Sequence, residues 1–450
     1  MTECNTNQAR ESSPQFEFSF LQSCKVTVDF KGGDTTSDAG WVWLRQEDER
    51  QGLCEAIVSA IHDDRDQRYV KHELLSLIRQ RVYQIAAGYE DCNDAGELRV
   101  DTLLKATAAD RKPEDAHLAS QPTLSRLENR TDEWELERIM EVFVDLYIKR
   151  RGDPPDYIIL DIDPTDDVCH GEQQMALFHG YYGEKIYHDL LLFDGETGDL
   201  IMPVLRPGNV HGADGVDLVL SWLLNRLREA WPDTEIVLCA DGGLASPRLY
   251  KLAEEEGIFY VIGLSTNDRL RAKNRKTLAE AQMRRDCEGR KVRVLNQFVY
   301  QAGSWDIPRR VICKAEILDK GANQRFVVTN LREGTPEAIY RFYCQRGERA
   351  ENRIKEWKAM MHADRLSCHE FYSNWFRMLL HSAAYQLMLG IRENLSATDF
   401  ERASMETLRL KLIKVGARIR STARRLWIHC ASGYPYKHIW DHLHRRLCPA

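Results

Sequence analysis

One short stretch constrains the fold more than any other. Residues 156–165 read Asp-Tyr-Ile-Ile-Leu-Asp-Ile-Asp-Pro-Thr, an apolar run that ends in carboxylates. Tyr157 to Leu160 carry aromatic and branched side chains, which is typical of a strand buried on both faces. Because strand side chains alternate, Asp161 and Asp163 project from the same face. Such carboxylates are solvated, paired with a cation or bound to a metal ion. Taken alone, the stretch also fits an ordinary strand end that leads into a polar loop.

A second apolar run ends in the same way further along the chain. Residues 235–241 read Glu-Ile-Val-Leu-Cys-Ala-Asp, and Gly242 and Gly243 follow directly. Glycine permits a close backbone approach or a positive φ angle at such a point. Asp241 is therefore predicted to lie at a second strand end, beside a tight turn.

A third acid lies in residues 343–358, whose charged and apolar residues predict a helix that begins just after Gly347. Glu351 and Lys358 are nearly two turns apart on this helix, so they share a face. Two strand-end aspartates and a helix-borne glutamate form the acidic triad of ribonuclease H-like nucleases. In that triad, oxygen ligands alone hold hard divalent cations.

Several separate stretches resemble the bacterial insertion-sequence DDE transposases, in particular insertion-sequence family 1380. The likeness runs from about Gly40 to the C-terminus. The resemblance implies an α/β fold: a ribonuclease H-like catalytic domain with a mainly β insertion, preceded by a helical N-terminal DNA-binding region and followed by a basic helical tail. The matching stretches are Arg81 to Asp91, Leu118 to Arg126, Asp161 to Thr165 with His170 and Gly171, Ala240 to Gly243, and Glu351 to Glu356.

The resemblance assigns the catalytic acids. It implies that Asp163, Asp241 and Glu351 bind the metal ions and carry the reaction, with Asp161 as the reserve for the first position. The expected cofactor is Mg²⁺ or Mn²⁺, with two ions in each active site. These ions would activate a water or a DNA 3′-hydroxyl and stabilise the leaving oxygen during in-line attack on a phosphodiester.

A wider motif of this class, Tyr-x2-Arg-x3-Glu-x6-Lys, surrounds the glutamate. Here Tyr343, Arg346, Glu351 and Lys358 fit it, but one extra residue separates Arg346 from Glu351 and rotates Arg346 by about 100° around the helix. Arg346 and Lys358 are expected to orient or neutralise DNA phosphate, together with Tyr343. Glu348 also precedes a lysine at the motif spacing, but the match of residues 351–356 favours Glu351.

The chain is expected to divide into five parts. The region from about Ser37 to Arg150 has a helical pattern, and a Pro- and Gly-containing stretch follows it. The resemblance then implies transposon-end binding by 1–150, catalysis by 151–264 and 333–395, a β-rich insertion at 265–332, and a basic helical region at 396–450.

Strand patterns mark the insertion and the strand before it. Residues 259–264 predict a catalytic-domain strand, and residues 291–301, 309–318 and 325–330 predict strands of the insertion. Trp305 lies between two of those strands, next to Arg309 and Arg310. In a relative of this class an insertion-domain tryptophan stacks on a flipped base, so the resemblance makes Trp305, Arg309 and Arg310 candidates for DNA binding. The alternative for Trp305 is packing within the insertion.

Charge is distributed unevenly along the chain. The formal net charge of −7 argues against a simple nucleic-acid binder. However, ten Lys and Arg lie in residues 268–293 against four acids, and ten lie in residues 405–446 against two. Arg418, Arg420, Arg424 and Arg425 are predicted to lie near one another on a helix of the tail, which would grip DNA or a second subunit. The resemblance implies double-stranded DNA as the partner, both transposon ends and target, and a homodimer on that DNA.

Bulk properties indicate the compartment. No apolar run approaches the roughly 18 to 20 residues that span a bilayer, and the polar first 20 residues do not form a signal peptide. Twelve cysteines without a Cys-x2-Cys pair indicate reduced thiols rather than zinc ligands or disulfides. The expected location is the bacterial cytoplasm, at the nucleoid.

Three other functions remain open at this point. The first is a metal-dependent nuclease of the same fold that cuts DNA without integrating it. The second is a carboxylate-pair glycosidase, which some of the ten tryptophans would suit. The third is a non-catalytic DNA-binding regulator, although all three acids are present.

Overall fold

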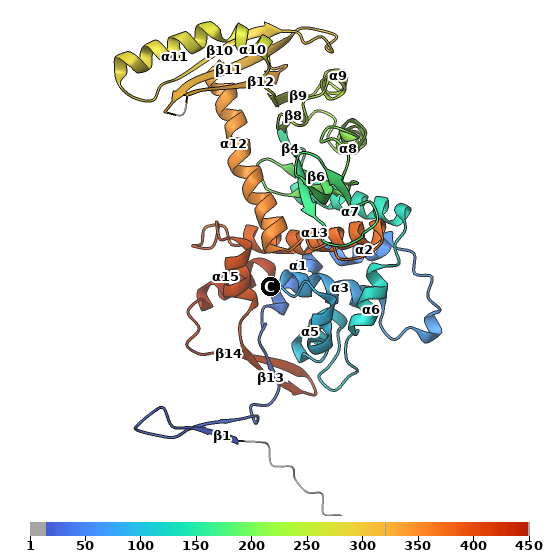
Figure 1. Cartoon of the computed structure of the whole chain (residues 1–450). Coiled ribbons are helices and arrows are strands. Elements are labelled where there is room, and N and C mark those ends of the chain that lie inside the picture. The colour runs from blue at the N-terminus through green and yellow to red at the C-terminus, as the bar shows by residue number, and fades with distance from the viewer. Residues whose placement is uncertain (1–14, 320, 449–450) are drawn as a thin grey trace, which may run out of the picture.

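The computed structural model describes residues 15–319 and 321–448, without the side chains of 348–350. A body of helices built from both ends of the chain lies at one end of the molecule, and a long sheet extends away from it (Figure 1). One long helix, α12 (Pro336–Lys355), runs beside the sheet and returns the chain to the helical body.

The N-terminal region is helical, as predicted. It follows the short strands β1 (Gln15–Phe18), β2 (Val26–Asp29) and β3 (Thr35–Thr36). Its longest helix, α7, starts with a capping box formed by Asp132 and Glu135, which satisfies backbone N–H groups that the helix cannot. The helices are α1 (Trp41–Gln51), α2 (Leu53–Ala60), α3 (Leu74–Ala86), α4 (Ala95–Leu98), α5 (Thr102–Ala109), α6 (Gln121–Glu128) and α7 (Glu133–Arg151), with 3₁₀ turns at Gln67–Tyr69 and Cys92–Asp94.

Nine of the described strands form one mixed sheet, in the order β10-β11-β12-β9-β8-β4-β6-β5, with β7 also paired to β6. Within it, β4 pairs antiparallel with β6 and parallel with β8, which in turn is parallel to β9. The strands are β4 (Tyr157–Val168), β5 (Leu177–His179), β6 (Glu184–Asp194), β7 (Leu200–Val204), β8 (Glu235–Ala240), β9 (Phe259–Leu264), β10 (Arg293–Tyr300), β11 (Arg309–Leu318) and β12 (Gly321–Thr329).

The two faces of the sheet bury different side chains of β4. Ile158, Leu160 and Ile162 lie in one core with residues of α8 (Val216–Ala230) and α9 (Pro247–Glu255). Ile159 lies in a separate core, where it packs with residues of β9 and α12. The predicted alternation is therefore present, and it places Asp161 and Asp163 on the face that α12 covers.

Helix α12 starts earlier than predicted. Its N-cap is Thr335, whose side chain accepts a hydrogen bond from the backbone of Ala338, and Pro336 follows at the first helical position. The helix continues through Gly347, so the prediction of a start after this glycine was wrong. A glycine inside a helix costs only about 1 kcal/mol, which the burial of Ile339 and Tyr340 against the sheet outweighs.

The region 265–332 contains helices as well as the three predicted strands. Its basic segment forms α10 (Asp268–Lys273) and α11 (Arg275–Glu288), which the expectation of a mainly β insertion did not include. Its strands extend the main sheet, because β12 pairs antiparallel with β9. The region is therefore continuous with the sheet that carries the acids.

The C-terminal region returns to the helical body. The buried helix α13 (Phe371–Glu393) packs against α1, α3, α7 and β7. The tail was predicted to be helical, and α14 (Met405–Leu408), a π-helical turn (Arg409–Ile413) and α15 (Lys437–Leu447) are. Residues 417–430 are not, because they form the hairpin of β13 (Ala417–Thr422) and β14 (Arg425–Cys430).

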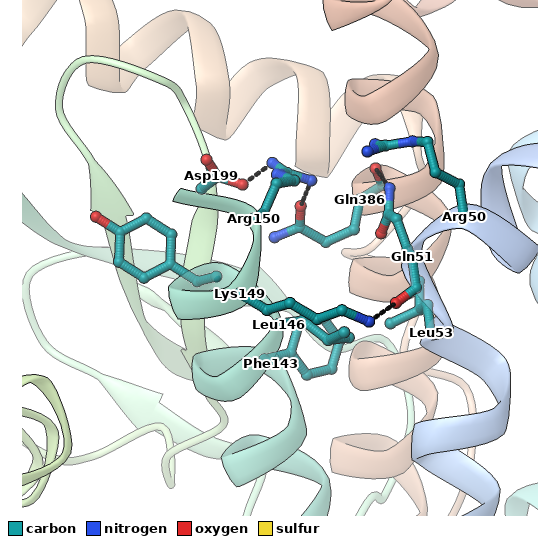
Figure 2. Close-up of a pocket in the computed structure, with 10 residues that line it drawn as sticks. Arg50, Gln51, Leu53, Phe143, Leu146, Lys149, Arg150, Asp199 and Gln386 are labelled. Atoms are coloured by element: carbon teal, nitrogen blue, oxygen red, sulfur yellow. Dashed lines mark hydrogen bonds and ion pairs between the residues drawn. The ribbon is translucent and has the colours of Figure 1, made fainter. Parts of the chain in front are cut away.

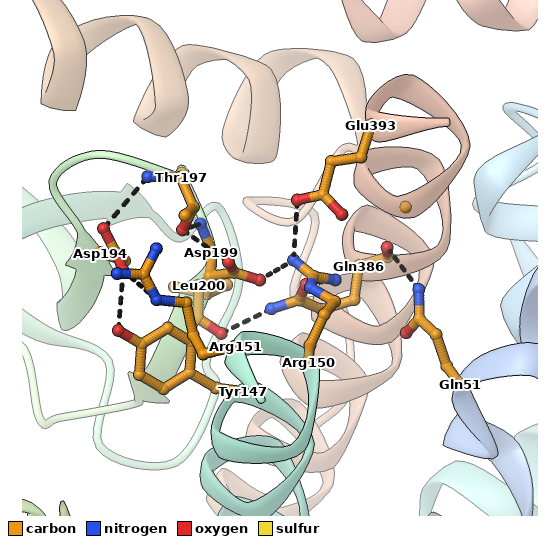
Figure 3. Close-up of polar contacts among 12 residues, drawn as sticks. Gln51, Tyr147, Arg150, Arg151, Asp194, Thr197, Asp199, Leu200, Gln386 and Glu393 are labelled. Atoms are coloured by element: carbon orange, nitrogen blue, oxygen red, sulfur yellow. Dashed lines mark hydrogen bonds and ion pairs between the residues drawn. The ribbon is translucent and has the colours of Figure 1, made fainter. Parts of the chain in front are cut away.

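A polar junction joins the helical body to the sheet. Arg150, near the end of α7, forms ion pairs with Asp199 and with Glu393, and it donates a hydrogen bond to Gln386 on α13 (Figure 3). A cavity of about 140 Å³ lies beside this cluster, lined also by Lys149 and by residues of α1 and α2 (Figure 2). Burial lowers the pKa of Arg150 from its ordinary value, and the charge of Glu393 opposes this change.

Two expectations drawn from composition can be compared with the described residues. No disulfide links the cysteines among them, as predicted for reduced thiols. None of the helices in this part of the chain has the length and apolar character needed to cross a bilayer.

Candidate active site

Two of the predicted acids lie side by side where the parallel pairing of β4 with β8 ends. Asp241 follows the end of β8, as predicted, but Asp163 is not at a strand end, because β4 continues to Val168 in its pairing with β6. The last registered pair between β4 and β8 is Ile162 with Ala240, and Asp163 and Asp241 follow these residues directly. Both aspartates are partly exposed, and the Asp241 carboxylate accepts a hydrogen bond from the backbone N–H of Gly243 at 2.9 Å. The parallel pairing thus brings together two acids that are far apart in the sequence.

The third acid, Glu351, lies on α12, and its charge affects Asp163. Glu351 is exposed on this helix. The pKa of Asp163 is raised to about 6, chiefly because the carboxyl is buried, and the negative charges of Asp241 and Glu351 raise it further. The neighbouring Arg346 opposes this rise. The three acids are therefore close enough to repel one another electrostatically.

Arg346 contacts the first acid directly. Its guanidinium lies 2.8 Å from the Asp163 carboxylate and donates a hydrogen bond to the carbonyl of Ile162 at 3.1 Å. Burial alone would lower the pKa of Arg346, but the charges of Asp163 and Asp161 raise it. The extra residue before Glu351 therefore leaves Arg346 pointing into the site. Its role in binding DNA stays a prediction.

Tyr343 packs against Gly263 of β9, close to the turn that follows Asp241. A Cβ atom on Gly263 of β9 would lie 2.5 Å from the Tyr343 hydroxyl oxygen and 2.8 Å from the backbone nitrogen of Gly242. Both separations are shorter than real Cβ contacts. Only glycine at this position allows β9, Tyr343 and the turn after Asp241 to pack together.

We predict that Gly263→Ala lowers the rate of the DNA cutting that the resemblance implies by about 100-fold, because the added methyl group displaces the turn that positions Asp241. Steady-state cutting and thermal unfolding should be measured together. Gly303→Ala is the matched control, because a Cβ there meets no atom within 4 Å. Full activity of Gly263→Ala would show that the turn tolerates the displacement.

Asp161 has different surroundings from Asp163. It is only 1% exposed, and its carboxylate lies 3.7 Å from the guanidinium of Arg353. Arg353 also donates hydrogen bonds to the carbonyls of Asp194 and Gly195. Asp161 thus belongs to a buried contact between β4 and α12, two residues before Asp163, which is partly exposed.

Lys358 lies against the second half of β4. It follows α12 in a π-helical turn (Glu356–Met360) and donates a hydrogen bond to the carbonyl of Asp166. Its ammonium lies 3.7 Å from the buried carboxylate of Asp167. The carboxyl of Asp189 on β6 is also buried, and its charge raises the pKa of Asp167. Lys358 is thus the cation beside a buried pair of acids.

We predict that Asp189→Asn stabilises the protein at pH 8 but not at pH 4. Burial raises the pKa of Asp189 to about 7. Because the folded state holds this proton more tightly than the unfolded state, stability falls as the pH rises from about 4 through about 7. The asparagine removes this loss, on the order of 1–4 kcal/mol at pH 8.

Urea unfolding of both proteins at pH 4 and pH 8 measures this difference. Asp145→Asn serves as the control, because Asp145 is 54% exposed and paired with Arg226 on the surface. An Asp189→Asn effect of the same size at both pH values would contradict the assignment.

The carboxylates fit hard divalent cations by their chemistry, because Mg²⁺ and Mn²⁺ prefer oxygen ligands. Besides burial, repulsion from Asp241 and Glu351 raises the pKa of Asp163, and a bound cation would relieve this repulsion. Within residues 15–319 and 321–448, however, no three His, Cys, Asp or Glu side chains are arranged closely enough to hold a metal ion. In this arrangement the Asp163 carboxylate is paired with Arg346.

The three predicted DNA-binding residues of the insertion have protein partners. Trp305 is 7% exposed, and its ring lies 5.4 Å from those of Tyr250 and Tyr300. Arg309 stacks on Trp305 and pairs with Glu254 at 2.8 Å. Stacking of Trp305 on a base would require it to leave this cluster. Arg310 hydrogen-bonds to Gln297 and to the backbone carbonyls of residues 331–334.

The sequence did not single out Tyr182 as a residue near the acids. It lies in the turn between β5 and β6, and its ring packs against those of Tyr181, His179 and His188. Burial raises its pKa, as do the charges of Asp166, Asp241 and Asp163. The adjacent aromatics Tyr181 and Tyr182 before Gly183 were the available signal, but only the pairing of β6 with β4 places Tyr182 here.

A comparison with known families gives the class of this protein. The family model described as "Transposase DDE domain group 1" matches residues 18–450. The chain therefore belongs to this family of DDE transposases, which are enzymes that cut and join DNA.

Among solved structures, the chain is similar to a piggyBac transposase, described in a cryo-EM structure of the synaptic complex with hairpin DNA. The two share 12% sequence identity with a TM-score of 0.44, over 84% of this chain and 80% of that one. This likeness is too distant to add to the family assignment. No curated protein matches the chain.

Proposed function

We propose that the chain binds the ends of an insertion sequence, resembling those of family 1380, and catalyses DNA strand cleavage and strand transfer at the acids on β4, β8 and α12. The observation that carries this proposal is the register of β4 with β8, which aligns Asp163 with Asp241. The effect of Glu351 on the pKa of Asp163 supports its place as the third acid.

The arrangement of the central strands supports a ribonuclease H-like catalytic domain. Three strands, β4, β6 and β7, form the antiparallel part, and β8 and β9 add to the other side of β4 in parallel. The acids lie on the middle strand and its parallel neighbour, so a DNA backbone crossing this edge would meet both at once.

The residues around the acids have separate roles in this proposal. When bound, two Mg²⁺ or Mn²⁺ ions would polarise the scissile phosphate and the attacking water or 3′-hydroxyl. Asp163, Asp241 and Glu351 would hold these ions. The ions would replace Arg346 as the partner of the Asp163 carboxylate. Arg346 would then be free to bind phosphate oxygens, and Lys358 would bind them after leaving Asp166 and Asp167. Tyr343 would keep α12 packed on β9. Acting on two transposon ends requires two copies, which we propose form a homodimer on bacterial DNA.

A labelled duplex that carries the sequences bordering the gene tests this function. We expect strand cuts at the border in Mg²⁺ or Mn²⁺ and none in excess EDTA. With a supercoiled plasmid added, the cut ends should appear joined to it. Cutting without joined products would indicate a nuclease that does not integrate, and binding without cutting in either metal would indicate a regulator.

A further inference from the structure

The β13–β14 hairpin presents an unusual exposed face. The hairpin projects from the far side of the helical body, away from the main sheet (Figure 1). Its inner face is anchored, because Ala417 and Ile419 are buried in the helical core and β3 pairs with β13. The registered pairs place the following exposed residues together on the outer face, called here the ribbon face: Arg418 with His429, Arg420 with Trp427, and Thr422 with Arg425.

The ribbon face is basic and carries no acid. Residues 417–430 contain four arginines and no Asp or Glu. Among the described ion pairs, none involves these arginines, whereas other exposed arginines such as Arg68 and Arg226 have carboxylate partners. The outer face therefore concentrates unneutralised positive charge in a chain whose net charge is −7.

An aromatic side chain lies in the middle of this charge. Trp427 is 44% exposed, and its ring stacks parallel to that of His429 at 6.0 Å, with an interplanar angle of 1°. The guanidinium of Arg425 lies 5.7 Å from the centre of the same ring. The hairpin thus holds a flat, solvent-facing surface of cations and rings.

We propose that the ribbon face binds duplex DNA outside the active site. Two strands about 4.8 Å apart, with their side chains, fit a major groove about 12 Å wide. Guanidinium groups bind phosphate oxygens, and counterion release makes such binding favourable. A protein partner fits less well, since the face offers one large apolar side chain and no carboxylate. The inference rests on the proposed function for its ligand, but the acids take no part in it.

Because the hairpin lies away from the acids, changing side chains of the ribbon face should weaken DNA binding without slowing DNA cutting. The double variant Arg418→Gln with Arg420→Gln should bind border duplex about 10- to 100-fold more weakly at low salt. Its slope of log affinity against log salt should fall by about 2. Trp427→Ala should lower the affinity for border duplex about tenfold. The cutting rate at saturating DNA should stay within twofold of wild type, about the error of such assays.

The controls separate charge, structure and function. Arg226→Gln with Lys251→Gln removes two exposed cations that have acid partners, and it should leave affinity and slope unchanged. Arg418→Lys with Arg420→Lys should restore the salt slope. Wild-type binding and cutting are measured first, so failure of the proposed function is visible before any variant is compared.

Two results would overturn the inference. The first is wild-type affinity and salt slope in the double glutamine variant. The second is a change from dimer to monomer in sedimentation with unchanged affinity for DNA, which would make the ribbon face a contact between two copies of the chain.

Discussion

Asp163→Asn, Asp241→Asn and Glu351→Gln should each lower DNA cutting by roughly 1,000-fold or more, while the affinity for border duplex should stay within about threefold. Each change would remove one charged oxygen of the proposed metal site but keep the size of the side chain. Charge stabilisation of several kcal/mol is lost in the transition state, and each 1.36 kcal/mol is a factor of ten. The measurement is single-turnover cutting in Mg²⁺ and Mn²⁺, with binding determined by fluorescence anisotropy.

A fourth variant separates the two candidates for the first acid. Asp161 is buried and faces Arg353, so Asp161→Asn should lower the melting temperature more than it lowers the cutting rate. Asp156→Asn, at the exposed start of the same strand, is the control and should change neither. If Asp163→Asn still cuts and Asp161→Asn does not, the first acid is Asp161.

The sequence predicted best where a local pattern decides the structure. The expected bounds of β9 and β11, residues 259–264 and 309–318, agree with the structure, because their apolar runs can only be buried as strands. The helical N-terminal region follows from its amphipathic pattern in the same way. These elements need no information about distant parts of the chain.

Prediction failed where charge was given more weight than periodicity. The tail, with residues 417–430, was predicted to be helical because it is basic and amphipathic, but Ile419, Leu426 and Ile428 alternate with exposed residues as in a strand. The helix α12 was cut short at Gly347 because a local breaker was given more weight than packing. The hairpin is local, since β13 pairs with the next strand, β14, whereas α12 packs on strands that lie far away in the sequence, such as β4 and β9.

The acids of the site were visible in the sequence, but their surroundings were not. That Arg346 lies on Asp163, or that Gly263 makes room for Tyr343, depends on how α12 packs across β4 and β9. An exposed and a buried tryptophan look alike in a sequence, so Trp305 could not be distinguished from Trp427. Side-chain placement of this kind is fixed by tertiary contacts, many of them between segments far apart in the sequence, such as that between Asp163 and Arg346.

Glu128→Gln should destabilise the protein by about 3–5 kcal/mol at pH 7, because it leaves two arginines without a counter-ion in the interior. Glu128 at the end of α6 is 2% exposed. Its carboxylate lies 2.5 Å from Arg81 of α3 and 3.0 Å from Arg377 of α13, and both guanidinium groups are buried. The carboxylate therefore holds three helices of the body together.

The same contact predicts a pH dependence. Burial alone would raise the pKa of Glu128, but the charges of Arg81 and Arg377 lower it to about 2. A depressed pKa means that this stabilisation is present above the unfolded value of about 4.3 and is lost as the pH falls towards 2. Urea unfolding should show a large difference between the two proteins at pH 7 and a smaller one at pH 3.

A matched variant tests whether burial is the cause. Glu55 also pairs with an arginine, Arg79, but its side chain is 66% exposed, so Glu55→Gln should cost less than about 1 kcal/mol. If Glu128→Gln costs no more than this, the buried guanidinium groups find enough partners in nearby backbone carbonyls. If Glu128→Gln loses the full predicted stability, the packing of α6 depends on this single carboxylate. If Glu128→Gln then binds border duplex more weakly under conditions where it stays folded, α6 contributes to DNA recognition.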